Sequence, residues 1–229
     1  MLDLVQSWRE QGEPASIRER ITDVNDGILA VAGMGLGLVG ADVSATTAYV
    51  VVCISAAVGA LSVFGVKVGE AFAEREAQQA TVAEERRLLE LTPDEEIAEL
   101  AASFEAKGVT ATTARQVAEE LSAADALSAQ LEVEYGIRDL TSTQEAWLAG
   151  MWAGLAFLLG SVTPLLITIL TPVTARAEWI VGMAVLSLAI TSLVLSRRGR
   201  SNVVATMLRS VVLGVGTLAI SYLLGDWLV

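Results

Sequence analysis

Long uncharged apolar blocks set the strongest limit on how this chain can fold. Residues 43–66 carry no charged side chain, and the same holds for residues 146–175 and 179–196. A soluble core does not need apolar blocks of this length, whereas a hydrocarbon layer about 30 Å thick does. Only helices and closed barrels satisfy their backbone polar groups in such a layer. The sequence therefore predicts an all-α membrane protein.

Five membrane-spanning helices are predicted. In chain order they lie at residues 24–41, 43–66, within 146–175, 179–196 and 203–224. The first and the last each contain one charged residue, Asp26 and Arg209, so hydropathy alone supports them less than the others. Pro164 and Pro172 are expected to interrupt the block that contains the third span.

The spans divide the chain into four predicted parts. These are an N-terminal cytoplasmic or interfacial segment (1–23), the first two spans (24–69), an acidic helical module (70–139) and the last three spans (140–229). Arginines precede the first span and join the fourth to the fifth, which places the N-terminus and the module in the cytoplasm and the C-terminus on the opposite side. The first residues do not resemble a signal peptide. Together with the high alanine content, this suggests a multi-pass protein of a bacterial inner (plasma) membrane.

Nearly all of the excess negative charge lies in the predicted module. The chain has a net charge of -12, and residues 70–134 contain sixteen carboxylates against five basic side chains. A nucleic-acid-binding protein would need a basic face, so that class is excluded. The chain has no histidine and one cysteine, Cys53, so a metal site must use oxygen or thioether ligands, which suit hard or borderline divalent cations. The sequence also lacks a nucleophile elbow and a phosphate loop, which argues against an enzyme.

Several residues of the module predict where its helices begin and end. The second span is expected to continue as a helix through Leu91, and residues 92–95 read as a capping box with proline at the first helical position. Gly108 is expected to end that helix. A third helix is expected to start near Thr112, and a fourth is expected to run from Ser122 to Gly136. The apolar face is expected to comprise Leu88, Leu89, Leu91, Ile97, Leu100, Phe104, Val117, Leu121, Leu127 and Leu131.

Five glutamates of the module are candidate metal ligands. Glu96 and Glu99 are three residues apart and share a helix face, and Glu85 ranks with them. Glu132 and Glu134 are placed to complete a site from a facing helix. The alternative is a solvated acidic surface that keeps the module away from anionic lipid headgroups.

Polar residues within or beside the spans are candidates for a transport pathway. Asp26 is either a functional intramembrane carboxylate or a helix N-cap. Met34 lies two turns further along the same helix, and Ser55 belongs to a stripe of small residues on the second span. Lys67, one turn before Glu70, either extends toward the lipid headgroups or pairs with Asp26. Glycines at positions 33, 35, 37 and 40 predict close helix packing or a dimer interface.

In its motifs and their order the chain resembles the vacuolar iron transporter (VIT) family from about Ser16 to the C-terminus. The motifs are Asn25-Asp26-Gly27, Gly59-Ala60-Leu61-Ser62, Thr163-Pro164-Leu165, Met207-Leu208 and Ser221-Tyr222-Leu223-Leu224-Gly225. The resemblance implies a homodimer in the lipid bilayer that exports Fe²⁺ or Mn²⁺ from the cytosol in exchange for protons, with no tightly bound cofactor. It assigns Asp26 to translocation, and Glu85, Glu96, Glu99 and Glu134 to metal binding in the module.

Several positions depart from the family pattern. Ser55 stands where the family has glutamate, and Val63 stands where it has methionine. Val66-Lys67 replaces a Gly-Glu pair, which a one-turn slip would instead match to Gly69-Glu70. In the module, Gln130-Leu131 replaces a methionine pair, and Leu88 stands where a glutamate is expected.

Three functions remain open at this stage. The first is a proton-coupled transporter of Fe²⁺ or Mn²⁺ with metal capture by the acidic module. The second is a VIT-like carrier that has diverged to a non-metal substrate through a Lys67–Asp26 pair. The third is a non-transporting scaffold or sensor whose acidic module binds a basic partner or a metal.

Overall fold

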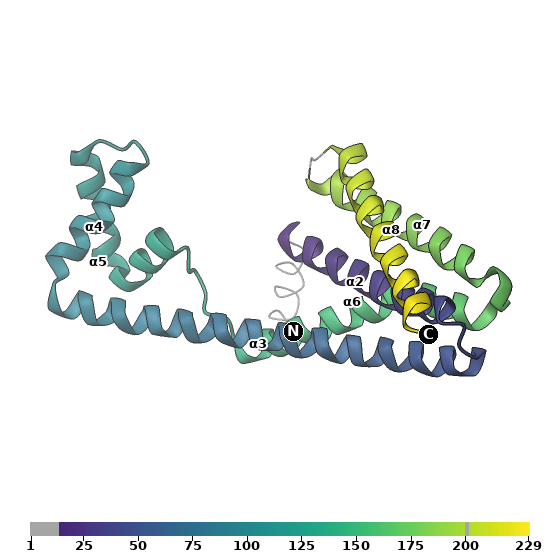
Figure 1. Cartoon of the computed structure of the whole chain (residues 1–229). Helices are drawn as coiled ribbons and strands as arrows, with labels where there is room; N and C mark the ends of the chain where they lie inside the picture. Colours follow the sequence, from purple (N-terminus) through teal and green to yellow (C-terminus); the bar gives the residue numbers. More distant parts are fainter. Residues whose placement is uncertain (1–13, 200–201) are drawn as a thin grey trace, which may run out of the picture. The chain divides into compact units, whose positions relative to one another are not determined.

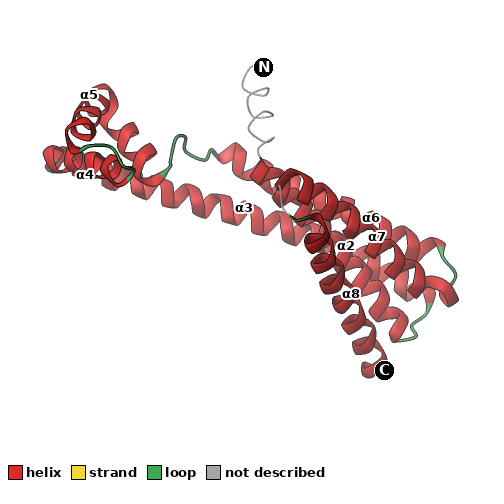
Figure 2. Ribbon diagram, turned by 90° about the horizontal axis from the view of Figure 1, so that it is seen from above, coloured by secondary structure: helices red, strands yellow, loops and turns green. Residues whose placement is uncertain are grey.

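The computed structural model describes residues 14–199 and 202–229, and within that part the chain forms helices and short connections without any β-strand (Figure 2). The elements labelled in Figure 1 are α2 (Pro14–Gly40), α3 (Ala45–Leu91), α4 (Pro93–Ala106), α5 (Ala111–Tyr135), α6 (Thr143–Leu170), α7 (Arg176–Gly199) and α8 (Val203–Leu228). A 3₁₀ turn, η1 (Val173–Ala175), precedes α7. Residues 1–13 of the predicted N-terminal segment lie outside the described residues.

Four helical stretches of the described chain are long and apolar enough to cross a membrane. They lie in Ala45–Leu91, Thr143–Leu170, Val173–Arg197 and Val203–Leu228. α2 is not among them, because Asp23, Asn25 and Asp26 lie inside the stretch that would have to cross. A fifth span through α2 therefore stays a prediction.

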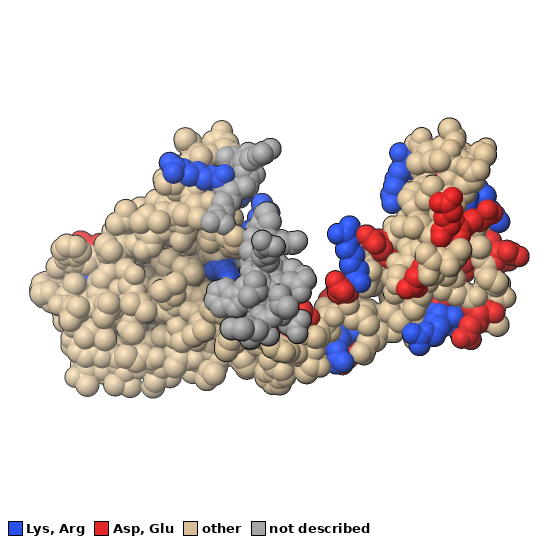
Figure 3. Space-filling model, turned by 180° about the vertical axis from the view of Figure 1, so that it is seen from behind, with Lys and Arg blue, Asp and Glu red and all other residues tan. Residues whose placement is uncertain are grey.

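The chain divides into two compact units. One, which we call the apolar-helix unit, comprises the residues up to Lys67 together with Leu148–Val229. The other, which we call the acidic unit, comprises Val68–Trp147. In Figure 3 the visible face of the apolar-helix unit is mostly free of charged atoms, whereas red and blue side chains crowd the acidic unit.

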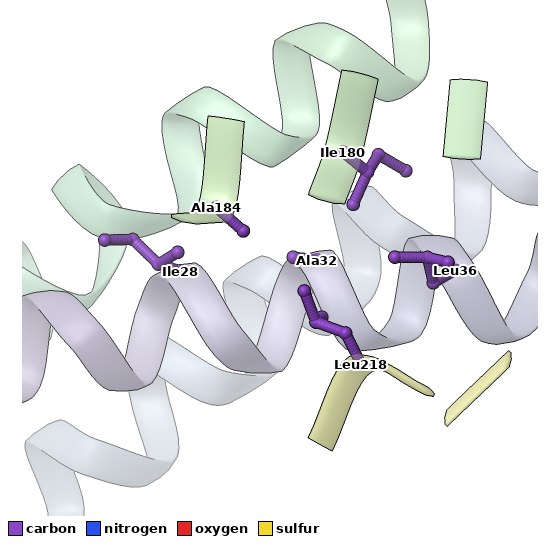
Figure 4. Close-up of a cluster of buried hydrophobic side chains, with 6 residues drawn as sticks. All are labelled: Ile28, Ala32, Leu36, Ile180, Ala184 and Leu218. Carbon is purple, nitrogen blue, oxygen red and sulfur yellow. The ribbon is translucent and has the colours of Figure 1, made fainter. Parts of the chain in front are cut away.

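The core of the apolar-helix unit is formed where α2 meets α7 and α8. Figure 4 shows six buried side chains that point toward one another from these helices: Ile28, Ala32 and Leu36 of α2, Ile180 and Ala184 of α7, and Leu218 of α8. A second buried cluster joins Val31 of α2 to Val52 and Ala56 of α3. Large and small side chains alternate in these contacts, which allows the helix backbones to approach closely.

Glycines on α2 face other helices of the same chain. A Cβ atom added at Gly27 would collide with the backbone of Phe157 in α6, and one added at Gly40 would collide with the backbone of Tyr222 in α8. Gly225 of α8 approaches the backbone of α2 in the same way. Of the two predicted uses of these glycines, close helix packing is the one for which the fold gives a direct reason.

The expected interruption of the third span at Pro164 is wrong. α6 continues through this proline to Leu170 and ends before Pro172. Proline has no backbone N–H, so the Gly160 carbonyl one turn earlier loses its helical donor. One turn later the Thr168 hydroxyl donates to the Pro164 carbonyl at 2.8 Å. Membrane helices tolerate prolines because one missing hydrogen bond does not break the rest of the helix and the surrounding protein can satisfy the freed group.

The helices of the acidic unit follow the predicted boundaries closely. α3 runs without a break to Leu91, and Gly108 ends α4 with a φ of 93°. Pro93 is the first residue of α4, but the capping box is wrong, because the Thr92 hydroxyl donates to the Leu88 carbonyl and makes no cap hydrogen bond. The predicted third and fourth helices form one element, α5, which is kinked at Asp125 and ends at Gly136 in the left-handed conformation.

Small residues form much of the core between α4 and α5. The buried residues are Leu100 and Ala101 of α4 and Ala114 and Ala118 of α5. The predicted leucine-rich face is only partly correct, since Leu91 and Leu121 are exposed. Alanines allow the two helices to pack closely, and the larger Ile97 and Phe104 fill the edges of the cluster.

Candidate functional site

Four of the predicted ligands in the acidic unit influence one another electrostatically. They are Glu85 of α3, Glu96 and Glu99 of α4, and Glu134 of α5, and we call them the carboxylate cluster. Glu85 is 2% exposed and Glu96 is 4% exposed. Carboxylates are rarely this deeply buried unless they are paired with a cation or fully hydrogen-bonded.

The hydrogen bonds around the two buried carboxylates are incomplete. Tyr135 Oη donates to Glu85 Oε1 at 2.7 Å. Gln130 Nε2 donates to the Glu96 backbone carbonyl at 2.8 Å and to Glu96 Oε2 at 3.0 Å. Glu85 Oε2 and Gln130 Oε1 are buried and receive no hydrogen bond from the described residues. Each such oxygen costs about 1–3 kcal/mol unless water or a cation compensates it.

Burial and mutual repulsion make Glu96 and Glu134 reluctant to hold negative charge. Burial raises the pKa of Glu96, and the neighbouring carboxylates of Glu85 and Glu99 raise it further. The pKa of Glu134 is raised by burial and then by the same neighbours. The hydrogen bond to Glu85 is the main cause that raises the pKa of Tyr135 to about 12. A divalent cation would relieve this repulsion directly.

Glu132, the fifth predicted ligand, lies apart from the cluster. Its carboxylate pairs with Arg138, with Oε1 at 2.8 Å from Nε. Among the residues that the structure describes, no three Asp, Glu, Cys or His side chains converge tightly enough to hold a metal ion as they stand. The four carboxylates therefore come from three helices, and their side chains would have to move inward to surround an ion.

In the apolar-helix unit the structure brings Asp26 and Lys67 within electrostatic reach of each other. Asn25 and Asp26 do not cap the first helix, because α2 already begins at Pro14, and the N-cap interpretation is therefore wrong. The Asn25 side-chain carbonyl instead accepts a hydrogen bond from the Thr191 hydroxyl of α7 at 2.6 Å.

The other predicted pathway residues lie elsewhere. Met34 is 40% exposed and lines a groove of about 690 Å³ between α2 and α8, whose lining does not include Asp26. Ser55 is half-buried on α3, and Glu70 is exposed on the part of α3 that belongs to the acidic unit.

Sequence reasoning missed three residues that these contacts single out. Gln130 and Tyr135 complete the surroundings of the carboxylate cluster. The sequence marked Gln130 only as a departure from the family's methionine pair, and the one signal for Tyr135 was its position beside Glu134. Arg176, at the start of α7, is 2% exposed and donates to the Tyr49 hydroxyl and the Thr171 carbonyl. Its single positive charge in a loop gave no hint of burial.

Comparison with known proteins assigns the chain to a protein family. Residues 17–226 match the model of the VIT family. The chain is also 29% identical over 213 residues to a vacuolar iron transporter of Acanthamoeba castellanii (strain ATCC 30010 / Neff), an alignment that covers 92% of this chain and 77% of that protein. The matched region contains the carboxylate cluster and the four apolar helices, apart from the last two residues of α8. This chain is therefore a multi-pass membrane protein that belongs to the VIT family.

Proposed function

We propose that this protein is a transporter that moves a divalent metal cation, Fe²⁺ or Mn²⁺, out of the cytosol in exchange for protons. The observation that carries the proposal is the burial of Glu85 and Glu96 within a cluster of four carboxylates. Such an arrangement is unfavourable by itself and favourable around a hard cation, because oxygen ligands and negative charge are what Fe²⁺ and Mn²⁺ require. The relative named above, a vacuolar iron transporter, supports the same assignment.

In this proposal the acidic unit captures the metal ion and the apolar-helix unit transports it. The carboxylate cluster captures the ion from the cytosol, and Asp26 of α2 carries the ion or the exchanged proton through the membrane. Asp26 suits that role because an ionisable side chain among apolar helices marks an ion pathway by default. The protein acts as a homodimer in a bacterial inner membrane, with its N-terminus in the cytoplasm.

A flux measurement in liposomes tests this function. Purified protein is reconstituted with a metal-sensitive dye inside the vesicles, and Mn²⁺ or Fe²⁺ entry is followed under an imposed pH gradient. We expect wild-type protein to move metal and Asp26→Asn to abolish the flux. Asp42→Asn is the matched control, because Asp42 has a φ of 47°, a conformation that asparagine adopts readily. Absence of metal flux from wild-type vesicles under a pH gradient would refute the proposal.

A second candidate function follows from Lys67. Its ammonium group acts on Asp26, and a cation there opposes the entry of a divalent ion. A VIT-like carrier of a non-metal substrate, with Lys67 and Asp26 as a switchable pair, fits this observation. Lys67→Glu distinguishes the two functions. Metal flux that appears only in this variant favours the diverged carrier, whereas unchanged flux in a protein that already moves metal excludes it.

A further inference from the structure

Arg176, the first residue of α7, is a buried cation in the apolar-helix unit. It is 2% exposed, and no carboxylate of the described residues lies within ion-pair distance of it. A guanidinium stays charged in proteins, so it cannot relieve the cost of burial by losing a proton. Charged side chains are rarely buried unless they are paired. The described part of the chain therefore buries this charge without supplying a counter-ion.

The hydrogen bonds of Arg176 leave part of its guanidinium without an acceptor. Nη2 donates to the Tyr49 hydroxyl at 3.4 Å and to the Thr171 backbone carbonyl at 3.3 Å, both longer than the usual range of about 2.7–3.2 Å. Nε is buried and donates to no atom of the described residues. Nε and Nη2 form one edge of the guanidinium, and such an edge holds a carboxylate or a phosphate through two parallel hydrogen bonds. The edge that would bind an anion thus has only weak, neutral partners.

The ring of Tyr49 explains the position of Arg176 only in part. Arg176 Cζ lies over this ring, 5.4 Å from its centroid. A cation–π contact is attractive, but it brings no negative charge and no acceptor for Nε. Tyr49 lies near the start of α3 and is half-buried. A rotation of its side chain would uncover the guanidinium toward the surroundings of the helices.

Arg176 lies at the depth of the lipid headgroups. The apolar helical stretches Thr143–Leu170 and Val173–Arg197 are both long enough to cross a membrane, and only residues 171–172 separate them. A connection this short keeps the ends of both stretches at the membrane surface. Trp179, about one turn further along α7, is 56% exposed, as is typical of tryptophans at the boundary between lipid and water. The anionic groups concentrated at this depth are lipid phosphates.

We propose that Arg176 is the centre of a binding site for the phosphate group of a membrane phospholipid, at the end of the spans where α6 joins α7. The phosphodiester accepts hydrogen bonds from Nε and Nη2 and neutralises the buried charge. The Tyr49 side chain turns aside to admit it. This site lies outside the acidic unit, and the inference does not depend on the proposed metal transport.

A lipid titration tests the site on the full-length protein in dodecyl maltoside. Dioctanoyl phosphatidylglycerol is added in increasing concentration, and the melting temperature is followed, because a ligand of the folded state raises it. Two parallel titrations use dioctanoylglycerol, which has the acyl chains without the phosphate, and sodium phosphate, which has the phosphate without the chains. We expect phosphatidylglycerol alone to stabilise the wild-type protein. An equal shift with dioctanoylglycerol would assign binding to the acyl chains, and an equal shift with sodium phosphate would assign it to free phosphate. Either result overturns the inference.

Three variants assign the stabilisation to one residue. Arg176→Gln removes the charge and should abolish the shift caused by phosphatidylglycerol. Arg176→Lys keeps the charge but loses the paired hydrogen bonds, so the lipid concentration at half-maximal shift should rise about tenfold. Arg209→Gln is the matched control, because it removes the same charge from an exposed position of α8 and should keep the wild-type shift. An equal loss in Arg209→Gln and Arg176→Gln would indicate general attraction to anionic lipid and would overturn the inference.

Two further outcomes are decisive. If Arg176→Gln does not fold, the comparison is between wild type and Arg176→Lys, and an unchanged half-maximal concentration overturns the site. If phosphatidylglycerol does not stabilise the wild-type protein, the site is overturned whatever the variants do. In that case, conversion of dimers to monomers by Arg176→Gln in native mass spectrometry would identify the counter-ion as a carboxylate of a second copy of this chain.

Discussion

Glu85 is almost fully buried, yet only one of its two carboxylate oxygens receives a hydrogen bond. Leaving a buried charged oxygen uncompensated costs stability, so a chain selected for stability alone would place an apolar side chain here. The other buried carboxylate, Glu96, shares its surroundings and adds repulsion. At the scale of single residues, the burial of these carboxylates therefore supports the proposal that the cluster binds a cation.

The Tyr135–Glu85 hydrogen bond gives a prediction about stability. Tyr135→Phe should lower the unfolding free energy of the metal-free protein by about 1–3 kcal/mol, because it leaves both oxygens of a buried carboxylate without a donor. Tyr222→Phe in α8 is the control and should have little effect, since that side chain is 39% exposed. Denaturant or thermal unfolding in detergent measures the difference. Equal stability of Tyr135→Phe and wild type would contradict this account of Glu85.

The raised pKa of Glu96 sets the sign of a pH dependence. Because burial, Glu85 and Glu99 raise its pKa above the ordinary value of 4.5, the folded state binds this proton more readily than the unfolded state. Metal-free protein should therefore gain stability as the pH falls through the raised pKa toward 4.5, and lose that gain as the pH rises. Glu134 on α5 acts in the same direction.

Glu96→Gln provides the check on that pH dependence. The variant removes the titrating carboxyl, so its melting temperature should vary less between pH 4.5 and 7.5 in the presence of a chelator. Glu84→Gln is the matched control, because Glu84 is exposed and pairs with Arg87. A melting temperature of Glu96→Gln that follows the wild-type curve throughout this range would show that Glu96 is not the group responsible.

At the scale of helices, the sequence predicted most element ends, and the reasons are local. The end of α3 at Leu91 and the end of α4 at Gly108 follow from proline and glycine, whose backbone preferences act regardless of tertiary packing. The break within α5 was expected at Ser122 and lies at Asp125, whose carboxylate accepts a hydrogen bond from the Ser128 backbone. Both residues cap helices well, so local preference alone did not decide between them.

Close packing of α2 against α8 gives a prediction at the same scale. Gly225→Ala should destabilise the apolar-helix unit by about 1–3 kcal/mol or more, because the added Cβ collides with the backbone of Gly37. Gly216→Ala on the same helix is the control, since nothing lies within 4 Å of the added atom. Thermal unfolding of both variants in detergent compares them. A Gly225→Ala protein as stable as Gly216→Ala would contradict the packing described here.

For the whole molecule, charge and hydropathy identified the fold class from the sequence, but they did not identify all of the site. The separation of apolar blocks from a segment with sixteen carboxylates and five basic residues predicted helices of two kinds. Four glutamates of the cluster were predicted from spacing and family resemblance. The neutral partners were not predicted as site residues, because a buried hydrogen bond between distant helices leaves no periodic signal in the sequence; Gln130 was noted only as a departure from the family pattern, and Tyr135 not at all.

The location of a bound ion tests the central claim most directly. Crystals of the full-length protein soaked with Mn²⁺ and measured with anomalous scattering would show where the metal binds. The account predicts an anomalous peak bounded by the carboxylates of Glu85, Glu96, Glu99 and Glu134, which disappears in the double variant Glu85→Gln/Glu96→Gln and persists in Glu84→Gln. A Mn²⁺ peak elsewhere in the acidic unit, or none there at saturating Mn²⁺, would contradict it.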